Sequence, residues 1–181
     1  VEIGLDRAGF LHASDILRTP SADVEPEANS FTPPINELLH EGQEIVVQVV
    51  KDPIGSKGAR LTTQISIPSR YLVLLPRSRV VGVSARIEGD DERARLKALV
   101  AELAAPGNTH GYIVRTNAEG QPAEALAEDI AYLGRVWRLV EDTAAGASVG
   151  NCIYEDLSLP LRAVRDLIRR GEVHEVKEAM D

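Results

Sequence analysis

Apolar residues recur at two different spacings along this chain, and the spacing changes near Pro68. Before Pro68, short β-branched runs alternate with glycine and proline turns, a pattern typical of strands. The strongest run, residues 44–50, is nearly continuous, so we expect a strand that is buried on both sides. The other elements expected in this half are a strand end at 1–3, a strand around 9–12, a proline-rich loop over 18–34, a short helix over 35–40, a turn at 52–58 and a strand over 59–67.

Beyond Pro68, apolar residues fall at helical spacing in three segments. Residues 91–103 and 123–140 each carry one apolar stripe, which predicts two amphipathic helices. Pro160 is expected to open a third helix, which ends near Gly171 and turns Leu161, Val164, Leu167 and Ile168 inward. Strands are expected at 71–75, 80–87, 111–115 and 152–154. The sequence therefore predicts an α+β chain, with a small β-barrel up to about residue 68 and an α/β unit after it.

The charge of the chain is unevenly distributed. The 181 residues carry a formal net charge of −8 and are 44% hydrophobic, enough to form a packed core. Residues 45–87, however, contain seven basic residues and one acidic residue, a local net charge of +6. One interpretation is that this segment binds a polyanion such as nucleic acid, and the other is that its charges are simply solvated on strand faces.

Several classes of protein are excluded by composition. No apolar run approaches the roughly 20 residues that a membrane helix requires, and no signal peptide is expected, because the chain opens with neither a basic stretch nor an apolar core. The single cysteine, Cys152, rules out an internal disulfide framework and a cysteine-rich zinc site, so a cytoplasmic location is expected. Because the first residue is Val1 and not methionine, we expect a piece of a longer protein.

Most of the polar motifs have a structural interpretation. Residues 55–58 contain a glycine–lysine turn but lack the spacing of a phosphate loop, so Lys57 is interpreted as the basic tip of a hairpin. The acidic run 88–92 is interpreted as the start of a helix and not as a metal cluster. The four histidines are far apart in the sequence. No residue is assigned a catalytic or metal-binding role.

The sharper candidate site is Arg115-Thr116, at the end of the expected strand 111–115. A guanidinium and a hydroxyl at a strand end can hold a phosphate from several directions, and a terminal monophosphate offers the most free oxygens. The alternative is an arginine that pairs with acids of the following helix.

Ordered motifs over nearly the whole chain resemble the ribonuclease E/G family, closer to its ribonuclease G branch. The motifs are Gly9–Ile16, Gly42-Gln43 with Val46–Val49, Val49–Pro53, Lys57–Thr63, Ser69–Val73, Arg86–Glu88 and Ile113–Thr116. The resemblance implies an OB-fold RNA-binding domain over 1–68 without its first strand, a 5′-sensor domain over 69–157 and the start of a ribonuclease H-like subdomain over 158–181. A barrel that lacks one strand has an unpaired edge, so marginal stability is expected.

The resemblance also implies functional residues. Phe10, Lys57 and Arg60 are expected to contact single-stranded RNA. Arg115 and Thr116 are expected to grip a 5′-monophosphate, with Val73 and Ser69 in the pocket wall. Two positions depart from the ribonuclease E pattern, because Ser69 stands where that pattern has a glycine and Ala85 where it has an arginine.

The resemblance places RNA cleavage by magnesium-binding carboxylates, and a zinc link between subunits of a homo-oligomer, in a part beyond this chain. No cofactor is therefore expected in the chain itself, which is interpreted as the recognition half of an endoribonuclease. Two other hypotheses remain open: a freestanding adaptor that binds RNA or protein without catalysis, and an acidic domain whose basic stretch packs against a neighbour.

Overall fold

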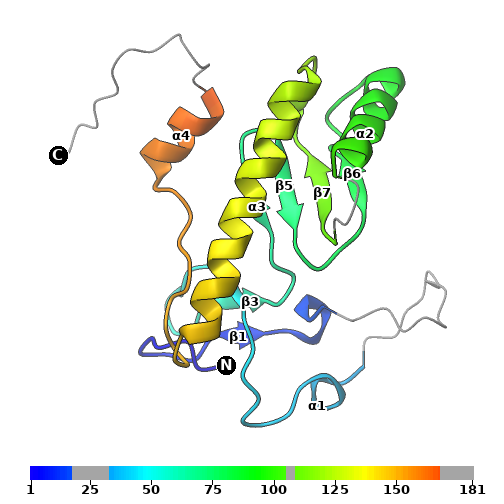
Figure 1. The fold of residues 1–181 in the computed structure, drawn as a ribbon. Helices are drawn as coiled ribbons and strands as arrows, with labels where there is room; N and C mark the ends of the chain where they lie inside the picture. The colour runs from blue at the N-terminus through cyan, green and yellow to red at the C-terminus, as the bar shows by residue number, and fades with distance from the viewer. Residues whose placement is uncertain (18–32, 105–108, 168–181) are drawn as a thin grey trace. The chain divides into compact units, whose positions relative to one another are not determined.

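The structure is a computed structural model that describes residues 1–17, 33–104 and 109–167 (Figure 1). The chain divides into two compact units: unit 1, Val1–Ile65 with Thr143–Ile153, and unit 2, Ser66–Asp142 with Tyr154–Asp181. The described residues form two small sheets and four α-helices, so the predicted α+β class is confirmed. The assignment of the parts to an OB-fold, a 5′-sensor domain and a ribonuclease H-like subdomain stays a prediction.

Unit 1 contains a three-stranded sheet in the order β1-β3-β2. Strand β3 (Arg60–Thr62) pairs in parallel with β1 (Phe10–Leu11) and antiparallel with β2 (Gln48–Lys51). The short helix α1 (Ile35–Leu38) agrees with the prediction, whereas no strand forms over residues 1–3. A small apolar core packs behind the sheet, with Leu11, Ile16, Ala59 and Leu61 buried and Ile45 and Val47 packed against them.

The prediction of a doubly buried strand over 44–50 is wrong. Only the end of this run forms β2, in which Val49 is 48% and Val50 52% exposed. Among the described residues β2 is an edge strand that pairs with β3 alone, and no neighbouring element there buries the side chains of Val49 and Val50. A β-branched run indicates a strand, but burial depends on what covers that strand.

The single strand expected over 59–67 is two strands. It consists of β3 in unit 1 and β4 (Ile67–Pro68) in unit 2. Threonine hydroxyls explain the break: Thr62 Oγ1 donates to the carbonyl of Asp15 at 2.9 Å and accepts from the amide of Gln64 at 3.0 Å. Such local side-chain bonds compete with the strand ladder and turn the chain.

Unit 2 contains a mixed four-stranded sheet in the order β4-β5-β7-β6. Strand β5 (Leu72–Leu75) pairs antiparallel with β4 and with β7 (Gly111–Val114), while β6 (Val81–Val83) runs parallel to β7. The three strands predicted at 71–75, 80–87 and 111–115 are confirmed, although each is shorter than predicted. One face of the sheet is buried, where Leu72, Leu74, Tyr112 and Val114 lie in register.

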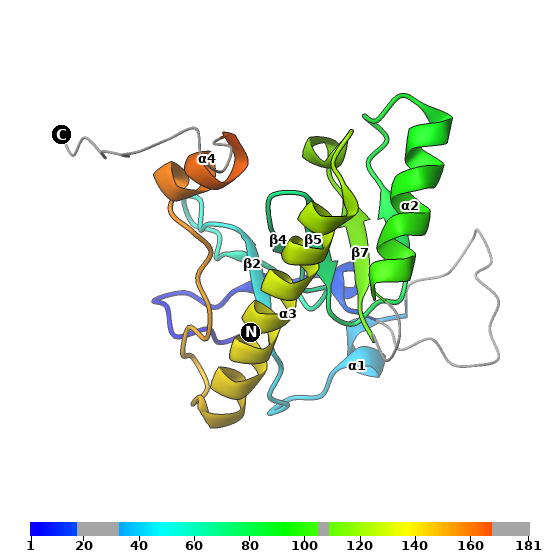
Figure 2. The same cartoon turned by 45° about the horizontal axis from the view of Figure 1, so that its top comes forward.

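Two helices follow the predicted apolar stripes, one within unit 2 and the other within it up to Asp142. Helix α2 (Asp90–Ala104) connects β6 to β7 and buries Leu96 and Val100. Helix α3 (Ala123–Gly146) buries Leu126, Leu133, Trp137 and Val140, and it runs past the predicted end at residue 140. In both ribbon views α2 lies beside β7 and α3 beside β5 (Figures 1 and 2). Both predicted helices are confirmed, and the apolar residues that each helix buries belong to its predicted apolar stripe.

The last described element departs from its prediction. Helix α4 (Leu159–Leu167) forms as expected near Pro160, but none of its residues is buried, and Leu167 is 78% exposed. The prediction that its apolar side chains face inward is therefore wrong for Leu161 and Leu167, and Val164 is only half-buried. The strand expected at 152–154 does not form. Ile168 and Gly171, like most of the loop expected at 18–34, lie outside the described residues.

Candidate functional site

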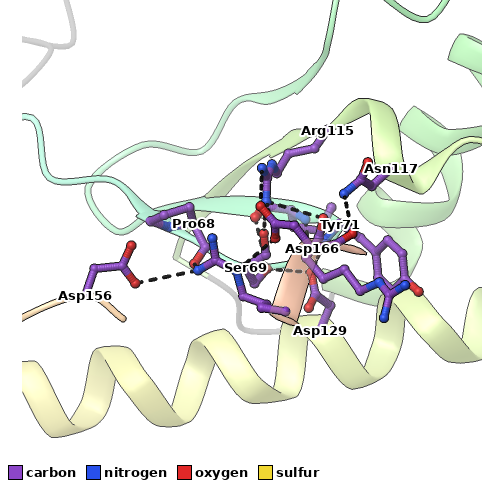
Figure 3. Close-up of polar contacts among 11 residues, drawn as sticks. Pro68, Ser69, Tyr71, Arg115, Asn117, Asp129, Asp156 and Asp166 are labelled. Carbon is purple, nitrogen blue, oxygen red and sulfur yellow. Dashed lines mark hydrogen bonds and ion pairs between the residues drawn. The ribbon is translucent and has the colours of Figure 1, made fainter. Parts of the chain in front are cut away.

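Arg115 lies directly after β7, where the antiparallel pairing brings it beside the turn that precedes β5. Its backbone amide donates to the carbonyl of Tyr71 at 2.8 Å. One guanidinium nitrogen, Nη1, donates to the carbonyls of Ser69 and Arg70 (Figure 3). The turn over residues 68–72, which we call the β4–β5 turn, therefore fixes the guanidinium through main-chain contacts.

The guanidinium of Arg115 also holds an anion. Arg115 Nη1 and Nη2 donate to the two carboxylate oxygens of Asp166 in α4, at 3.2 and 3.0 Å. The neighbouring Arg165 donates to the same carboxylate at 2.9 Å. Partial burial raises the pKa of Asp166, but the hydrogen bonds from Arg115 and Arg165 outweigh it and hold that pKa below its usual value. Asp166 is thus an ionised carboxylate in a bidentate arginine site.

A second carboxylate, Asp129 of α3, holds the same turn from the buried side. Its Oδ2 atom accepts hydrogen bonds from the Ser69 hydroxyl at 2.5 Å and from the amides of Tyr71 and Leu72 at 3.0 and 2.9 Å (Figure 3). Burial raises the pKa of Asp129, and these hydrogen bonds oppose the rise. Sequence reasoning missed Asp129. The available signal was an acidic residue three positions after Leu126 and four before Leu133, within the apolar stripe.

The other residues predicted for the phosphate site lie around this turn. Thr116 is exposed and begins the 3-10 helix η2 (Thr116–Ala118). Ser69 is 1% exposed and turns its hydroxyl toward Asp129, so only its carbonyl contacts Arg115. Val73 is half-buried and pairs with Ile113, on the sheet face opposite Leu72 and Leu74. The acid that pairs with Arg115 comes from α4 and not from the helix that follows it.

In unit 1, the predicted RNA-binding residues are solvent-exposed. Phe10 pairs with Arg60 across β1 and β3, so these two side chains lie on one sheet face, and Arg60 also pairs with Lys51 of β2, past an irregularity between Val49 and Lys51. Phe10 is 59% exposed, and Arg60 forms an ion pair with Asp15 at 3.0 Å. Lys57 lies at a turn bridged to Ile54. Lys51 was not predicted as a site residue, because only the register of the sheet places it beside Arg60.

Metal ligands do not gather in the part of the chain that the structure describes. No group of three or more histidine, cysteine, aspartate or glutamate side chains there could hold a metal ion. In the acidic run 88–92, three residues lie in the first turn of α2, and Glu92 pairs with Arg95 at 2.6 Å. The hydrogen bonds from Arg95 and from the amide of Gly120 lower the pKa of Glu92 to about 2. The described helices also include none with the length and apolarity to cross a membrane.

In unit 2, helices lie beside a sheet, and Arg115 holds the carboxylate of Asp166 with two nitrogens, an arrangement suited to binding an anion. Comparison with known families defines the class of the protein. Residues 66–177 match the Ribonuclease E/G family, so the chain belongs to that family. It is 50% identical to the ribonuclease G of Salmonella typhimurium over 167 residues, which is 92% of this chain and 34% of that protein. It is 48% identical to the ribonuclease G of Haemophilus influenzae, over 93% of this chain and 34% of that protein. A more distant relative, the ribonuclease E of Synechocystis, is 40% identical over 90% of this chain and 23% of its own length. The chain thus spans about a third of the ribonuclease G proteins it matches.

Proposed function

We propose that this chain is the RNA-recognition part of a ribonuclease G-like endoribonuclease and that Arg115 senses a 5′-monophosphate end of RNA. One observation carries the proposal: the guanidinium of Arg115, fixed by the carbonyls of the β4–β5 turn, grips an anion with two nitrogens. The occupant is a carboxylate, whose two oxygens stand in for two oxygens of a phosphate.

A terminal monophosphate suits this site better than an internal phosphodiester. It carries a charge of about −1.5 to −2 at neutral pH and three free oxygens, whereas a phosphodiester carries one charge and two free oxygens. Arg115 supplies a planar fork of donors, and the exposed Thr116 is the next residue along the chain. A terminal monophosphate can therefore accept hydrogen bonds from more of these donors than an internal phosphodiester can.

Unit 1 is proposed to hold the single-stranded RNA itself. Phe10 and Arg60 combine an exposed aromatic ring with a cation on one sheet face, and Lys51 is a second cation, paired with Arg60 on the adjacent strand β2. Bases stack on aromatic rings and phosphates pair with cations, which is how single strands are bound without strong sequence preference. Lys57 adds a third cation in the same unit.

The test compares two RNAs of identical sequence, one with a 5′-monophosphate and one with a 5′-hydroxyl, by fluorescence anisotropy with the full chain. We expect tighter binding of the 5′-monophosphate RNA. Arg115→Ala should abolish that preference, because a bidentate charge-assisted contact contributes about 1.5–3 kcal/mol.

The matched control is Arg95→Ala, which also removes an ion-paired arginine from unit 2 but leaves the β4–β5 turn untouched. It should keep the preference. Equal affinity of the unmodified chain for both RNAs would reject the sensing function and favour the alternative of a non-catalytic RNA-binding adaptor.

Cleavage is proposed for the whole protein. In this proposal the remaining two thirds of a ribonuclease G-like chain supply magnesium-binding carboxylates, the zinc link and the contacts of a homo-oligomer in the cytoplasm. The present chain contributes recognition of the substrate, and we expect no cleavage of RNA by the chain alone.

A further inference from the structure

Asp166 occupies the position on Arg115 that the proposed function assigns to a phosphate. Both of its carboxylate oxygens accept from Arg115, at 3.2 and 3.0 Å, and Arg165 donates to Oδ1 at 2.9 Å (Figure 3). A bidentate carboxylate and a bidentate phosphate use the same two donors of a guanidinium. The two anions cannot occupy this edge of Arg115 together.

Among the described residues, polar contacts and not a core hold Asp166 in place. None of the described residues of helix α4 is buried. Its anchors are the donation from Arg165 Nη1 to the carbonyl of Pro68 at 3.1 Å, the ion pair of Arg165 with Asp156 at 3.5 Å, and the donation from Asn117 Nδ2 to the carbonyl of Asp166 at 3.4 Å. The side chains of Arg165, Asp156 and Asp166 are 14%, 32% and 23% exposed, so these pairs are partly buried, and they are the contacts that a competing anion has to replace.

Arg115, in contrast, keeps contacts that do not involve α4. Its guanidinium also donates to the carbonyls of Ser69 and Arg70, and Asp129 fixes the turn that carries these carbonyls. Removal of Asp166 would therefore leave the donor in place with two free N–H groups. A preorganised donor with a removable internal anion is the arrangement that a competing ligand requires.

We propose that Asp166 is an internal competitor of the RNA 5′-phosphate, so that binding of a 5′-monophosphate at Arg115 releases α4. This inference rests on the proposed function and adds a regulation of the same site. A monophosphate brings more negative charge than the carboxylate it replaces, whereas an internal phosphodiester brings no more. By linkage, each anion lowers the affinity of the site for the other.

Release of α4 has an observable consequence. The described part of α4 has no buried residue of its own, and helices in proteins depend mostly on tertiary contacts, so α4 should lose helical hydrogen bonds when it detaches. The proposal thus makes two separate statements, one on the affinity for RNA and one on the protection of the α4 amides from hydrogen exchange.

The first experiment measures the affinities of the full chain and of Asp166→Asn for the 5′-monophosphate and 5′-hydroxyl RNAs. We expect Asp166→Asn to bind the 5′-monophosphate RNA roughly threefold to tenfold more tightly, with a smaller gain for the 5′-hydroxyl RNA. The matched control is Glu92→Gln, which removes the charge of another ion-paired carboxylate in unit 2 whose partners are Arg95 and the amide of Gly120, not Arg115 or α4. It should leave both affinities within about twofold.

The second experiment follows hydrogen exchange of α4 in the unmodified chain. The 5′-monophosphate RNA should increase exchange over residues 159–167, and the 5′-hydroxyl RNA should not. This readout needs no variant, and Asp166→Ala provides a second substitution if the asparagine variant folds poorly.

The outcomes separate this inference from the proposed function. If the unmodified chain prefers the 5′-monophosphate, Arg115→Ala removes that preference, and Asp166→Asn binds the 5′-monophosphate RNA equally or more weakly, then only the competition is wrong. Unchanged or increased protection of α4 with the 5′-monophosphate RNA would overturn it as well. If the unmodified chain shows no preference, the proposed function fails, and the inference fails with it.

Discussion

The two units contain strands of similar composition in very different surroundings. In unit 2 the sheet has one covered face, and Leu72, Leu74 and Val114 are fully buried there. In unit 1 the β-branched residues Val49 and Val50 lie half-exposed on an edge strand. The comparison shows that the strand-forming tendency of a segment and its contribution to a core are separate properties.

The two units also differ in how each holds a predicted RNA-binding arginine. Both Arg60 and Arg115 form an ion pair of 3.0 Å with an aspartate that is distant in sequence. The Arg60 side chain is 50% exposed, whereas that of Arg115 is 29% exposed and also donates to two main-chain carbonyls. We infer that Arg115 is a fixed donor suited to one ligand geometry and that Arg60 is a more general cation.

The comparison of the sheets predicts the largest effect. Val114→Ala in unit 2 should destabilise the chain by about 2–3 kcal/mol, because it removes fully buried methyl groups and leaves a cavity. Val49→Ala makes the same change on the exposed edge strand and should cost about 0.5 kcal/mol or less. Urea unfolding followed by circular dichroism measures both. Equal costs would mean that β2 is covered in solution.

The comparison of the arginines predicts a smaller and more selective effect. Arg60→Ala should weaken binding of the 5′-monophosphate and 5′-hydroxyl RNAs by the same factor. The slope of the logarithm of the binding constant against the logarithm of the salt concentration should become shallower by about 0.7, as expected for one lost phosphate contact on a single strand. Arg115→Ala should instead weaken binding of the 5′-monophosphate RNA alone. Binding titrations over a range of salt concentrations test both, and a change of end preference in Arg60→Ala would erase the distinction.

The smallest effect concerns the two carboxylates at the β4–β5 turn. The lowered pKa of Asp166 means that its stabilising contribution is present above the ordinary value of 3.8 and is lost as the pH falls through the lowered pKa. The raised pKa of Asp129 has the opposite sign, so its contribution is present below 3.8 and is lost as the pH rises through the raised pKa. Thermal melting should be measured as a function of pH over this range. Asp166→Asn should reduce the loss of thermal stability at low pH, and Asp129→Asn should reduce the loss of thermal stability as the pH rises. The same pH profile for both variants would contradict the assignment.

Local patterns predicted the elements of unit 2 well. The stripes of α2 and α3 and the strand β5 were visible in the sequence, because each element repeats its buried side chains at a fixed spacing. The exposure of β2 and of α4 could not be predicted, since burial depends on neighbours that no local pattern specifies. For the same reason Asp166 was missed as the partner of Arg115, from which it is 51 residues distant.

The antiparallel pairing of β5 with β7 has a consequence for how this family can vary. Four consecutive residue pairs, from Leu72 with Val114 to Leu75 with Gly111, fix the alignment of the two strands. Since neighbouring residues of a strand point to opposite faces, a slip of a single position would turn Leu72 and Leu74 outward and carry Arg115 away from its carbonyl partners. Insertions and deletions should therefore be tolerated in the connections of this unit and rejected within these two strands, whatever the length of the rest of the chain.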